Sequence, residues 1–380
     1  MRLLMVSGDR QVVLGEKGPF FSMQREFSRH FERVDVLCPR PSRKPVVTTI
    51  HERVHFHPAD VPPSRSAGWI ARTGEALIAE HGHGLVVSHD YGWFRNGVGS
   101  ARLSRKTGVP YVSEIHHVPG FPFAASWRER FDRSLARRYV RWAKDRAAAF
   151  RVVNRGEMPP LLARWGVPEE KILVLPSLYI DLAVFRPETP RPAHDQDLVF
   201  VGRMVENKGL DRIVDALAKL AARGKRFSIL FVGKGRMRGP TEERARKRGV
   251  DARFVDWVES PEDLARIYRR SRLVVCASSC EGGPRFTVEA MACGVPAVST
   301  PVGVMNEMLG VDPSSRTGLL CGFDVESLAS AIDAALSDEA ARMAMGRLAV
   351  AAASRYEYAA TIRGYADGLK GVAARVEEAA

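Results

Sequence analysis

The chain has 380 residues and a formal net charge of +13, from 57 Lys and Arg against 44 Asp and Glu. Hydrophobic residues make up 45% and charged residues 27%, which is typical of a globular protein, and the length indicates two domains. No apolar run is long enough to span a bilayer, so a transmembrane helix is not expected. The positive charge favours anionic partners, namely nucleotide phosphates, an anionic membrane surface or nucleic acid.

The N-terminal sequence MRLLMVSGDR is too short and too polar for a signal peptide and is predicted to begin with a strand. The five cysteines are scattered, and Cys276 and Cys280 lack further cysteine or histidine partners at zinc-ligand spacing. We therefore expect a cytoplasmic protein in a reducing compartment.

The first half of the chain alternates predicted strands and helices. A strand over 2–7 is followed by a glycine-containing loop, a helix over 19–34 and a strand in VDVLCP, and VHFHP, LVVSHD and YVSEIHH continue as strands. This order is typical of a doubly wound domain of the nucleotide-binding type, although no G-x-G-x-x-G fingerprint is present.

Two of these strands end in polar residues, which are His89, Asp90, Glu114, His116 and His117. In a parallel sheet the binding cleft lies outside the carboxyl ends of the strands, so these residues are candidates for a site. The alternative for the histidines is local hydrogen bonding. Because adjacent residues of a strand point to opposite faces, at most one of the two neighbouring histidines is expected to matter in the cleft.

A long helix is predicted over 127–149. Its cations are Arg128, Arg130, Arg133, Arg137, Arg138, Arg141, Lys144 and Arg146, and its aromatic residues are Trp127, Phe131, Tyr139 and Trp142. One interpretation is a helix with aromatic residues in the core and solvated arginines. The other is a basic amphipathic surface that contacts anionic lipid.

The segment PETPRPAHDQD contains three prolines and predicts an interdomain linker. We expect a first domain over 1–186, the linker over 187–196, a second domain over 197–358 and a final helix over 359–380. The second half repeats the strand and helix pattern, and it is predicted to be helical throughout from Asp324. The Asp195-Gln196-Asp197 triplet matches a metal-binding D-x-D pattern, but it precedes a strand and is interpreted as linker.

The stretch from Cys280 to Pro301 contains two carboxylates, Glu281 and Glu289, on either side of a Gly-Gly-Pro turn and the start of a short predicted helix. Glycines before a helix N-terminus leave amides unpaired at the positive end of the helix dipole, which suits a phosphate. Carboxylates beside a phosphate site can hold hydroxyl groups. The combination therefore favours a sugar nucleotide over a bare anion.

The motif GRMVENKG places Arg203 and Lys208 in the loop after the first strand of the second half, flanked by Gly202 and Gly209. Both cations can reach one diphosphate from this loop and can neutralise the charge that grows on a departing diphosphate. Gly233, in the turn after FSILFV, lets backbone approach a ligand, and an ordinary strand-to-helix turn is the alternative.

The loop around Trp257 and Val258 offers a place for a nucleotide base.

Together these motifs resemble those of the retaining glycosyltransferases of family 4, which have the GT-B fold. The pair Glu281 and Glu289 matches the family's E-x7-E motif, and Arg203 and Lys208 match its G-R-x(4)-K-G motif. Gly303 and Glu307 in PVGVMNEML and the segment VFRP support the match. The resemblance implies two Rossmann-like doubly wound domains that face a central cleft, with the C-terminal helix crossing back to the first domain.

The resemblance also implies roles for individual residues. Arg203 and Lys208 would hold the donor diphosphate and stabilise the leaving group, Glu281 would contact hydroxyls of the donor sugar, and Glu289 would bind the ribose. Further residues implied near the donor are His116, Gly18, Gly202, Gly233, Gly282, Gly283 and the backbone amides of Phe286 and Thr287.

The sequence therefore predicts an enzyme that moves a sugar from a UDP- or GDP-sugar to an acceptor hydroxyl with anomeric retention. No metal or other cofactor and no nucleic-acid partner is expected. Lipid-linked or cell-envelope glycans are candidate acceptors, and the inner face of the membrane is a candidate location. The segment 176–181 and the first glycine loop depart from the family pattern on the acceptor side, which leaves the acceptor open.

Two alternatives remain for the function. A basic membrane- or nucleic-acid-binding module without catalysis explains the charge but gives Glu281 and Glu289 no purpose, because acidic groups repel phosphate backbones. A sugar-nucleotide epimerase of the same fold is the other alternative, although its usual carboxylate and histidine signatures are absent.

Overall fold

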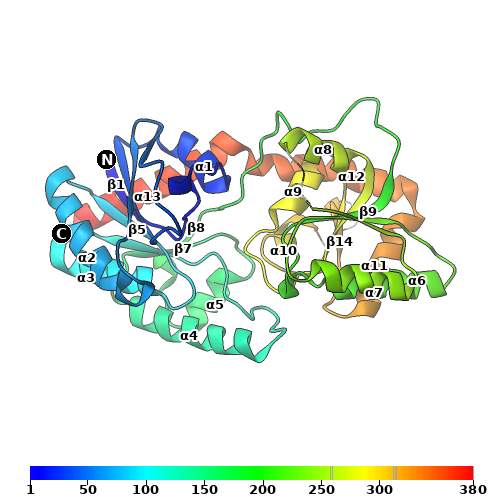
Figure 1. Cartoon of the computed structure of the whole chain (residues 1–380), viewed down its shortest axis with the longest axis horizontal. Coiled ribbons are helices and arrows are strands. Elements are labelled where there is room, and N and C mark those ends of the chain that lie inside the picture. Colours follow the sequence, from blue (N-terminus) through cyan, green and yellow to red (C-terminus); the bar gives the residue numbers. More distant parts are fainter. Residues whose placement is uncertain (257, 259, 311, 313–314, 380) are drawn as a thin grey trace.

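The computed structural model describes residues 1–256, 258, 260–310, 312 and 315–379. They form two parallel-sheet α/β domains side by side (Figure 1). The first sheet has the strand order β3-β4-β2-β1-β5-β6-β7-β8, and within the described residues its neighbouring strands pair in parallel except β3 with β4, which are antiparallel. Its strands are β1 (Arg2–Val6), β2 (Arg33–Cys38), β3 (Thr49–Ile50), β4 (Val54–Pro58), β5 (Leu85–His89), β6 (Tyr111–Glu114), β7 (Ala149–Val152) and β8 (Ile172–Val174). The helices between them are α1 (Pro19–Phe27), α2 (Ser66–His81), α3 (Arg95–Thr107), α4 (Trp127–Ala143) and α5 (Met158–Arg164).

The second sheet is parallel, with the order β11-β10-β9-β12-β13-β14. Its strands are β9 (Gln196–Val201), β10 (Ile229–Val232), β11 (Ala252–Val255), β12 (Ser271–Cys276), β13 (Ala297–Ser299) and β14 (Gly318–Leu320). The helices of this half are α6 (Leu210–Ala222), α7 (Arg238–Arg248), α8 (Pro261–Arg269), α9 (Arg285–Ala292), α10 (Met305–Met308), α11 (Val325–Ser337), α12 (Glu339–Ala353) and α13 (Tyr358–Ala379).

The strands are apolar on both faces because helices cover both faces of each sheet. In β1, Leu3 and Met5 pack with α1 and α13, whereas Leu4 and Val6 pack with α2 and α3. All four side chains are almost completely buried. Burial of a side chain of this size contributes about 1.5–3 kcal/mol, so a continuous apolar run is needed to hold a central strand between two helical layers.

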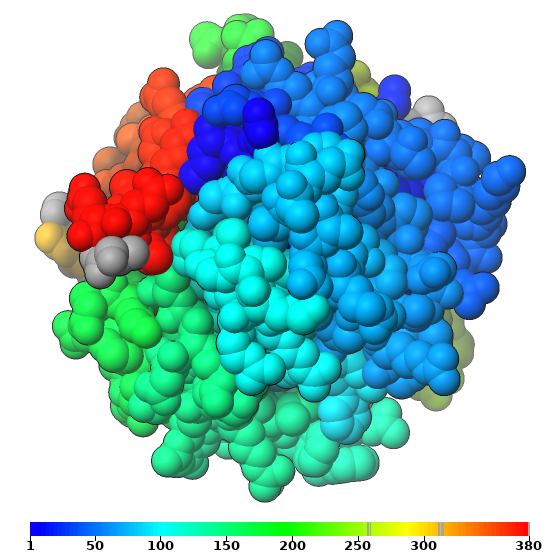
Figure 2. Space-filling view, turned by 90° about the vertical axis from the view of Figure 1, so that its left-hand side faces the viewer, coloured from blue at the N-terminus to red at the C-terminus, as the bar shows by residue number. Residues whose placement is uncertain are grey.

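The last helix, α13, returns to the first domain. Ile362, Tyr365, Leu369 and Val372 are buried in the core that also contains β1 and α1. Figure 2 shows the C-terminal residues in red against the blue and cyan residues of the first domain. The predicted two-domain fold with a helix that crosses back is confirmed.

The chain crosses between the domains twice at one place. The Ile180 amide donates to the Tyr356 carbonyl at 2.7 Å, and the Tyr358 amide donates to the Ile180 carbonyl at 3.0 Å. Leu178, Ile180 and Phe185 therefore pack in the core of the second domain, although they precede the predicted linker. In addition, β9 begins at Gln196, which is the last residue of that linker.

Three helical predictions are too long. The helix predicted over 19–34 ends at Phe27, and the helix predicted over 127–149 ends at Ala143. The alanine-rich end of the second one favours a helix locally, but the Ala148 amide donates to the Tyr111 carbonyl and leads into β7. The tail is divided into three helices rather than being helical throughout.

Candidate active site

Two loops of the second domain meet at the carboxyl edge of its sheet. Lys208 ends a short 3-10 turn after β9, and its Nζ forms an ion pair with Glu281 Oε1 in the loop after β12. The Asn207 side-chain amide also donates to the Cys280 carbonyl at 3.2 Å, and the Ser279 amide donates to the Asn207 carbonyl at 2.8 Å. Because β9 and β12 are neighbours, the fold brings together two motifs that lie far apart in the sequence.

Arg203 lies in the loop that carries Lys208. Its side chain is exposed, and it pairs with no carboxylate in the part of the chain that the structure describes. An exposed guanidinium beside a half-buried lysine can bind a diphosphate without breaking an existing ion pair.

Glycine occupies the different positions of the predicted site for different structural reasons. Gly202 and Gly233, which follow β9 and β10, have φ of 147° and 141°, and a Cβ on Gly233 would lie 1.9 Å from the Gly202 carbonyl oxygen. A Cβ on Gly282 would lie 2.7 Å from the His116 carbonyl oxygen in the other domain. Gly283 has room for a Cβ, since the nearest atoms belong to Val304 at 3.6 Å. The positive φ therefore explains Gly202, and close packing explains Gly233 and Gly282.

The predicted phosphate seat is the N-terminus of α9. The Thr287 amide donates to the Pro284 carbonyl at 3.1 Å, whereas the Phe286 amide donates to no acceptor among the described residues. The Phe286 ring is buried against Phe200 at 5.4 Å between centroids. Of the two predicted amides, that of Phe286 is therefore the better placed. Gly18 lies in the first domain, where it is the N-cap of α1.

Glu289 is buried on α9 and accepts two hydrogen bonds. Arg285 Nε donates to Oε1 at 2.8 Å, and the Tyr268 hydroxyl donates to Oε2 at 3.1 Å. Burial raises the pKa of Glu289, and Arg285 opposes that effect. The Arg285 guanidinium also lies 4.7 Å from the centre of the Tyr179 ring. The sequence reasoning missed Arg285, although its i, i+4 spacing from Glu289 was a usable signal.

The buried carboxylate of Glu114 holds several side chains at the carboxyl edge of the first sheet. Glu114 Oε1 accepts hydrogen bonds from Arg151 Nη1 at 2.8 Å and from the Tyr365 hydroxyl of α13 at 2.5 Å. Glu114 Oε2 lies 3.0 Å from His89 Nε2 and 3.6 Å from His116 Nε2. Burial alone would raise the pKa of Glu114, but Arg151 and the two histidines hold it well below its usual range.

The two neighbouring histidines face different surroundings. His116 turns back towards Glu114, whereas His117 is exposed and lies close enough to Glu281, Lys208 and Arg203 of the second domain for their charges to shift its pKa. The protein atoms around His117 lower its pKa, Glu281 raises it, and the two cations lower it further. Of the two histidines, His117 therefore lies nearer to these charges, although the family resemblance assigned the role to His116.

Backbone-to-carboxylate contacts join the two edges. Glu157 Oε1 accepts the Gly303 amide at 2.8 Å, and Glu307 Oε1 accepts the amides of Arg155 at 2.5 Å and Gly156 at 3.0 Å. Burial raises the pKa of Glu157 to about 7, and the Glu307 charge adds to this effect. Each domain therefore uses one glutamate to hold backbone of the other.

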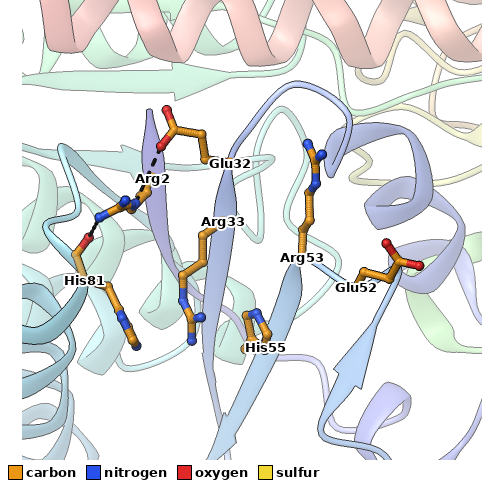
Figure 3. A pocket seen from close by; sticks show the side chains of 7 residues that line it. All are labelled: Arg2, Glu32, Arg33, Glu52, Arg53, His55 and His81. Atoms are coloured by element: carbon orange, nitrogen blue, oxygen red, sulfur yellow. Dashed lines mark hydrogen bonds and ion pairs between the residues drawn. The ribbon is translucent and has the colours of Figure 1, made fainter.

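A pocket of about 400 Å³ lies away from this site (Figure 3). Arg2, Arg33 and Arg53 line it together with Glu32 and Glu52, and these residues stand at the starts of β1, β2 and β4. Ligands of parallel sheets bind at the opposite, carboxyl edge. The pocket is therefore not part of the candidate active site.

In the described part of the chain, no group of three His, Cys, Asp or Glu residues could hold a metal ion. No helix among the same residues is both long and apolar enough to cross a membrane. Trp257, which was considered for base binding, lies outside the described residues.

Comparisons with known proteins agree with this geometry. The model of the glycosyl transferases group 1 family matches residues 183–350, and that of the glycosyl transferase 4-like domain matches residues 21–177. The D-inositol 3-phosphate glycosyltransferase of Pseudarthrobacter chlorophenolicus is 30% identical over 72% of this chain and 68% of its own length. That of Kineococcus radiotolerans is 30% identical over 76% and 71%, respectively.

Solved structures share the fold at low sequence identity. Sucrose-phosphate synthase from Thermosynechococcus elongatus superposes with a TM-score of 0.77 and 18% identity, with both chains fully covered. Anabaena HepE in complex with UDP and glucose superposes with a TM-score of 0.74 and 16% identity, covering 98% of this chain and all of that one.

Two Rossmann-like sheets that meet at their carboxyl edges, with a helix crossing back, define a glycosyltransferase of the GT-B fold. The chain belongs to the glycosyl transferases group 1 family. The predicted class of enzyme is confirmed.

Proposed function

We propose that this glycosyltransferase takes a sugar from a UDP- or GDP-sugar and transfers it to an acceptor hydroxyl with retention at the anomeric carbon. The observation that carries the proposal is the Lys208–Glu281 pair beside the unpaired Arg203 at the carboxyl edge of the second sheet. Anabaena HepE, which shares the fold, has been crystallised with UDP and with UDP-glucose. Its nucleotide is support for the proposal rather than a measurement on this chain.

In this mechanism the acceptor oxygen forms a bond to the anomeric carbon while the bond from that carbon to the diphosphate oxygen breaks. The leaving diphosphate gains negative charge, which Arg203 and Lys208 neutralise, and the acceptor proton moves to a phosphate oxygen. Attack and departure on the same face of the sugar give retention. These two cations can supply the neutralisation without a metal ion.

The remaining donor contacts follow from where the structure places the side chains. Glu281, held by Lys208, would accept hydrogen bonds from hydroxyls of the transferred sugar. The Phe286 amide would face a phosphate, and Glu289 would add a ribose contact to its bonds with Arg285 and Tyr268. His116, backed by Glu114, would lie near the transferred sugar on the opposite wall of the cleft.

We also propose that the enzyme works at an anionic membrane surface on a lipid-linked or cell-envelope acceptor. The two halves of α4 support this, because they differ. Tyr139 is buried and Trp142 packs on the core of the first domain, whereas the side chains of Trp127 and Phe131 are 72% and 49% exposed. Exposed aromatic side chains among arginines favour an interface between water and lipid.

Donor binding provides the direct test. The melting temperature of the purified chain would be measured with UDP-, GDP- and ADP-sugars, since a ligand that binds only the folded state raises it. A rise with a UDP- or GDP-sugar, followed by NMR of the product anomer, is the expected result. The absence of a rise with all three donors would contradict the proposal.

A further inference from the structure

A second pocket lies at the carboxyl edge of the first sheet. It has a volume of about 500 Å³ and opens among the residues that follow β1, β2, β4 and β5. β5 pairs with β6, the strand that leads to His116, and neighbouring strands lie about 4.8 Å apart. The pocket therefore begins about one strand away from the place where the transferred sugar is proposed to lie.

The charge in this pocket is of one sign. Arg10, Arg40 and Arg95 line it, and its lining contains no Asp or Glu. Within the described part of the chain none of the three arginines pairs with a carboxylate, and Asp9, next to the first of them, accepts the amides of Gln11 and Val12 instead. Arginines without protein partners beside an apolar wall suit a phosphate, which they can hold through paired hydrogen bonds.

The walls of the same pocket are aromatic and aliphatic. Trp69 and Ile70 from α2 line it and are buried, whereas Tyr91 and Trp93 line it with 59% and 64% of their surface exposed. Large exposed aromatic side chains that gather at one place mark a binding surface. The ligand that fits therefore carries apolar surface as well as an anion.

The aromatic surface continues from the pocket onto α4. The ring of Trp93 meets the ring of Phe131 edge to face, with 6.4 Å between centroids. Trp127, one turn before Phe131 on the helix, is also exposed and is followed by Arg128 and Arg130. α4 lies along the lower edge of the first domain in Figure 1. An apolar path flanked by cations thus leads out of the pocket.

We propose that this pocket binds the phosphate of an anionic membrane lipid, and that this lipid carries the acceptor hydroxyl. Arg10, Arg40 and Arg95 hold the phosphate, and the lipid chain leaves over Trp93 and Phe131 towards the membrane. A soluble sugar phosphate would satisfy the arginines but would leave this apolar path uncovered. The inference rests on the proposed function and specifies the chemical class of its acceptor.

The test uses calorimetry on the full-length chain with dihexanoyl phosphatidate below its critical micelle concentration. The expected result is binding that is about tenfold tighter than that of inorganic phosphate or dihexanoylglycerol, because only the phosphatidate uses both features. Inorganic phosphate or a short oligonucleotide that binds as tightly as the phosphatidate would overturn the proposal, and so would the absence of phosphatidate binding.

Charge reversal localises the binding. Arg10→Glu combined with Arg40→Glu should weaken phosphatidate binding by about tenfold or more, while Arg226→Glu, at an exposed unpaired arginine of the second domain, should leave it unchanged. Equal binding by all three proteins would overturn the assignment of the pocket. Donor-induced melting shifts measured on the same proteins keep the two proposals apart, because an intact shift with unaltered lipid binding refutes only the lipid site.

Discussion

The two carboxyl edges that face each other hold their charges in different ways. In the second domain Lys208 is paired with Glu281 and Arg285 with Glu289, and Arg203 lies beside them without a carboxylate partner among the described residues. In the first domain the carboxylate of Glu114 is buried behind the edge, and the three arginines of the adjacent pocket, Arg10, Arg40 and Arg95, pair with no carboxylate among the described residues. The second-domain edge therefore holds most of its charges in ion pairs before a ligand arrives, whereas the pocket at the first-domain edge offers arginines that form no such pairs.

This difference fits two kinds of substrate. A donor whose bond is broken needs charges that are already in place, because groups that reorganise during the reaction stabilise its transition state less. An acceptor needs only to be held near the reacting carbon, and an unpaired arginine can bind its anion without losing an ion pair. The following predictions disrupt one edge or the other, starting with the largest effect.

The largest effect is expected at the donor edge. Lys208→Ala and Glu281→Ala should each lower transfer by about 100-fold or more, since each removes a group that is proposed to act on the reacting sugar diphosphate. Turnover would be measured with the donor identified by melting shift. Lys219→Ala is the matched control, because this lysine forms an exposed ion pair with Glu326. Transfer at the wild-type rate in either active-site variant would refute the assignment.

At the acceptor edge, Glu114→Gln should destabilise the first domain. The change leaves the buried Arg151 without its charge partner, which costs about 3–5 kcal/mol. Tyr365→Phe removes one hydrogen bond to the same carboxylate and should cost only about 1 kcal/mol. Urea unfolding measures both values, and equal costs for the two variants would contradict the network described here.

The surface of α4 should carry membrane binding. Arg128→Glu with Arg130→Glu should lower flotation with vesicles of phosphatidylcholine and phosphatidylglycerol by about tenfold or more, since each cation near an anionic surface contributes about 1 kcal/mol. Added salt should weaken binding in the same way. Arg226→Glu with Arg246→Glu is the control on the second domain. If the wild-type chain fails to bind at low salt, the membrane proposal falls and the transferase stands.

The smallest effect concerns the contact between the edges. Burial raises the pKa of Glu157 to about 7 in the folded chain, from an ordinary value of 4.5. Its contribution to stability is therefore complete below about pH 4.5 and is lost as the pH rises through about 7, when the ionised side chain meets Glu307 and Glu281. In the Glu157→Gln variant the melting temperature should fall by about 3 °C less than in the wild type as the pH rises from about 5 to 8, because the variant side chain does not ionise. An unchanged pH profile would contradict this role.

Much of the fold could be predicted from local sequence patterns. The apolar runs of β1 and β12 and the glycine loops beside them marked parallel strands, because a strand buried on both faces needs apolar residues throughout. Helix ends were predicted less well, as the early end of α4 at Ala143 shows, because β-sheet pairing of residues around Ala148 overrides the helix preference of alanine.

The candidate site was predicted in part for the same reason. Arg203, Lys208, Glu281 and Glu289 stand in motifs whose spacing is visible in the sequence. Tyr365 was not found, because it reaches Glu114 only after α13 folds back across 251 positions of the chain. His117 was a candidate, but the pattern did not show which of the two neighbouring histidines is exposed, and the arginine-lined pocket was missed, since exposure depends on what the other elements cover.

By itself, the sequence determined the alternation of strands and helices, the family of the enzyme and the motifs that carry the cations and carboxylates of the proposed donor site. These properties are local, because they depend on periodicity and on residues a few positions apart. Only the tertiary structure decided which charges are paired, that Lys208 meets Glu281, and that the three arginines of the pocket beside Trp93 have no carboxylate partner in the part of the chain that the structure describes. Pairing and burial depend on distances between residues that are remote in the chain, and folding alone sets those distances.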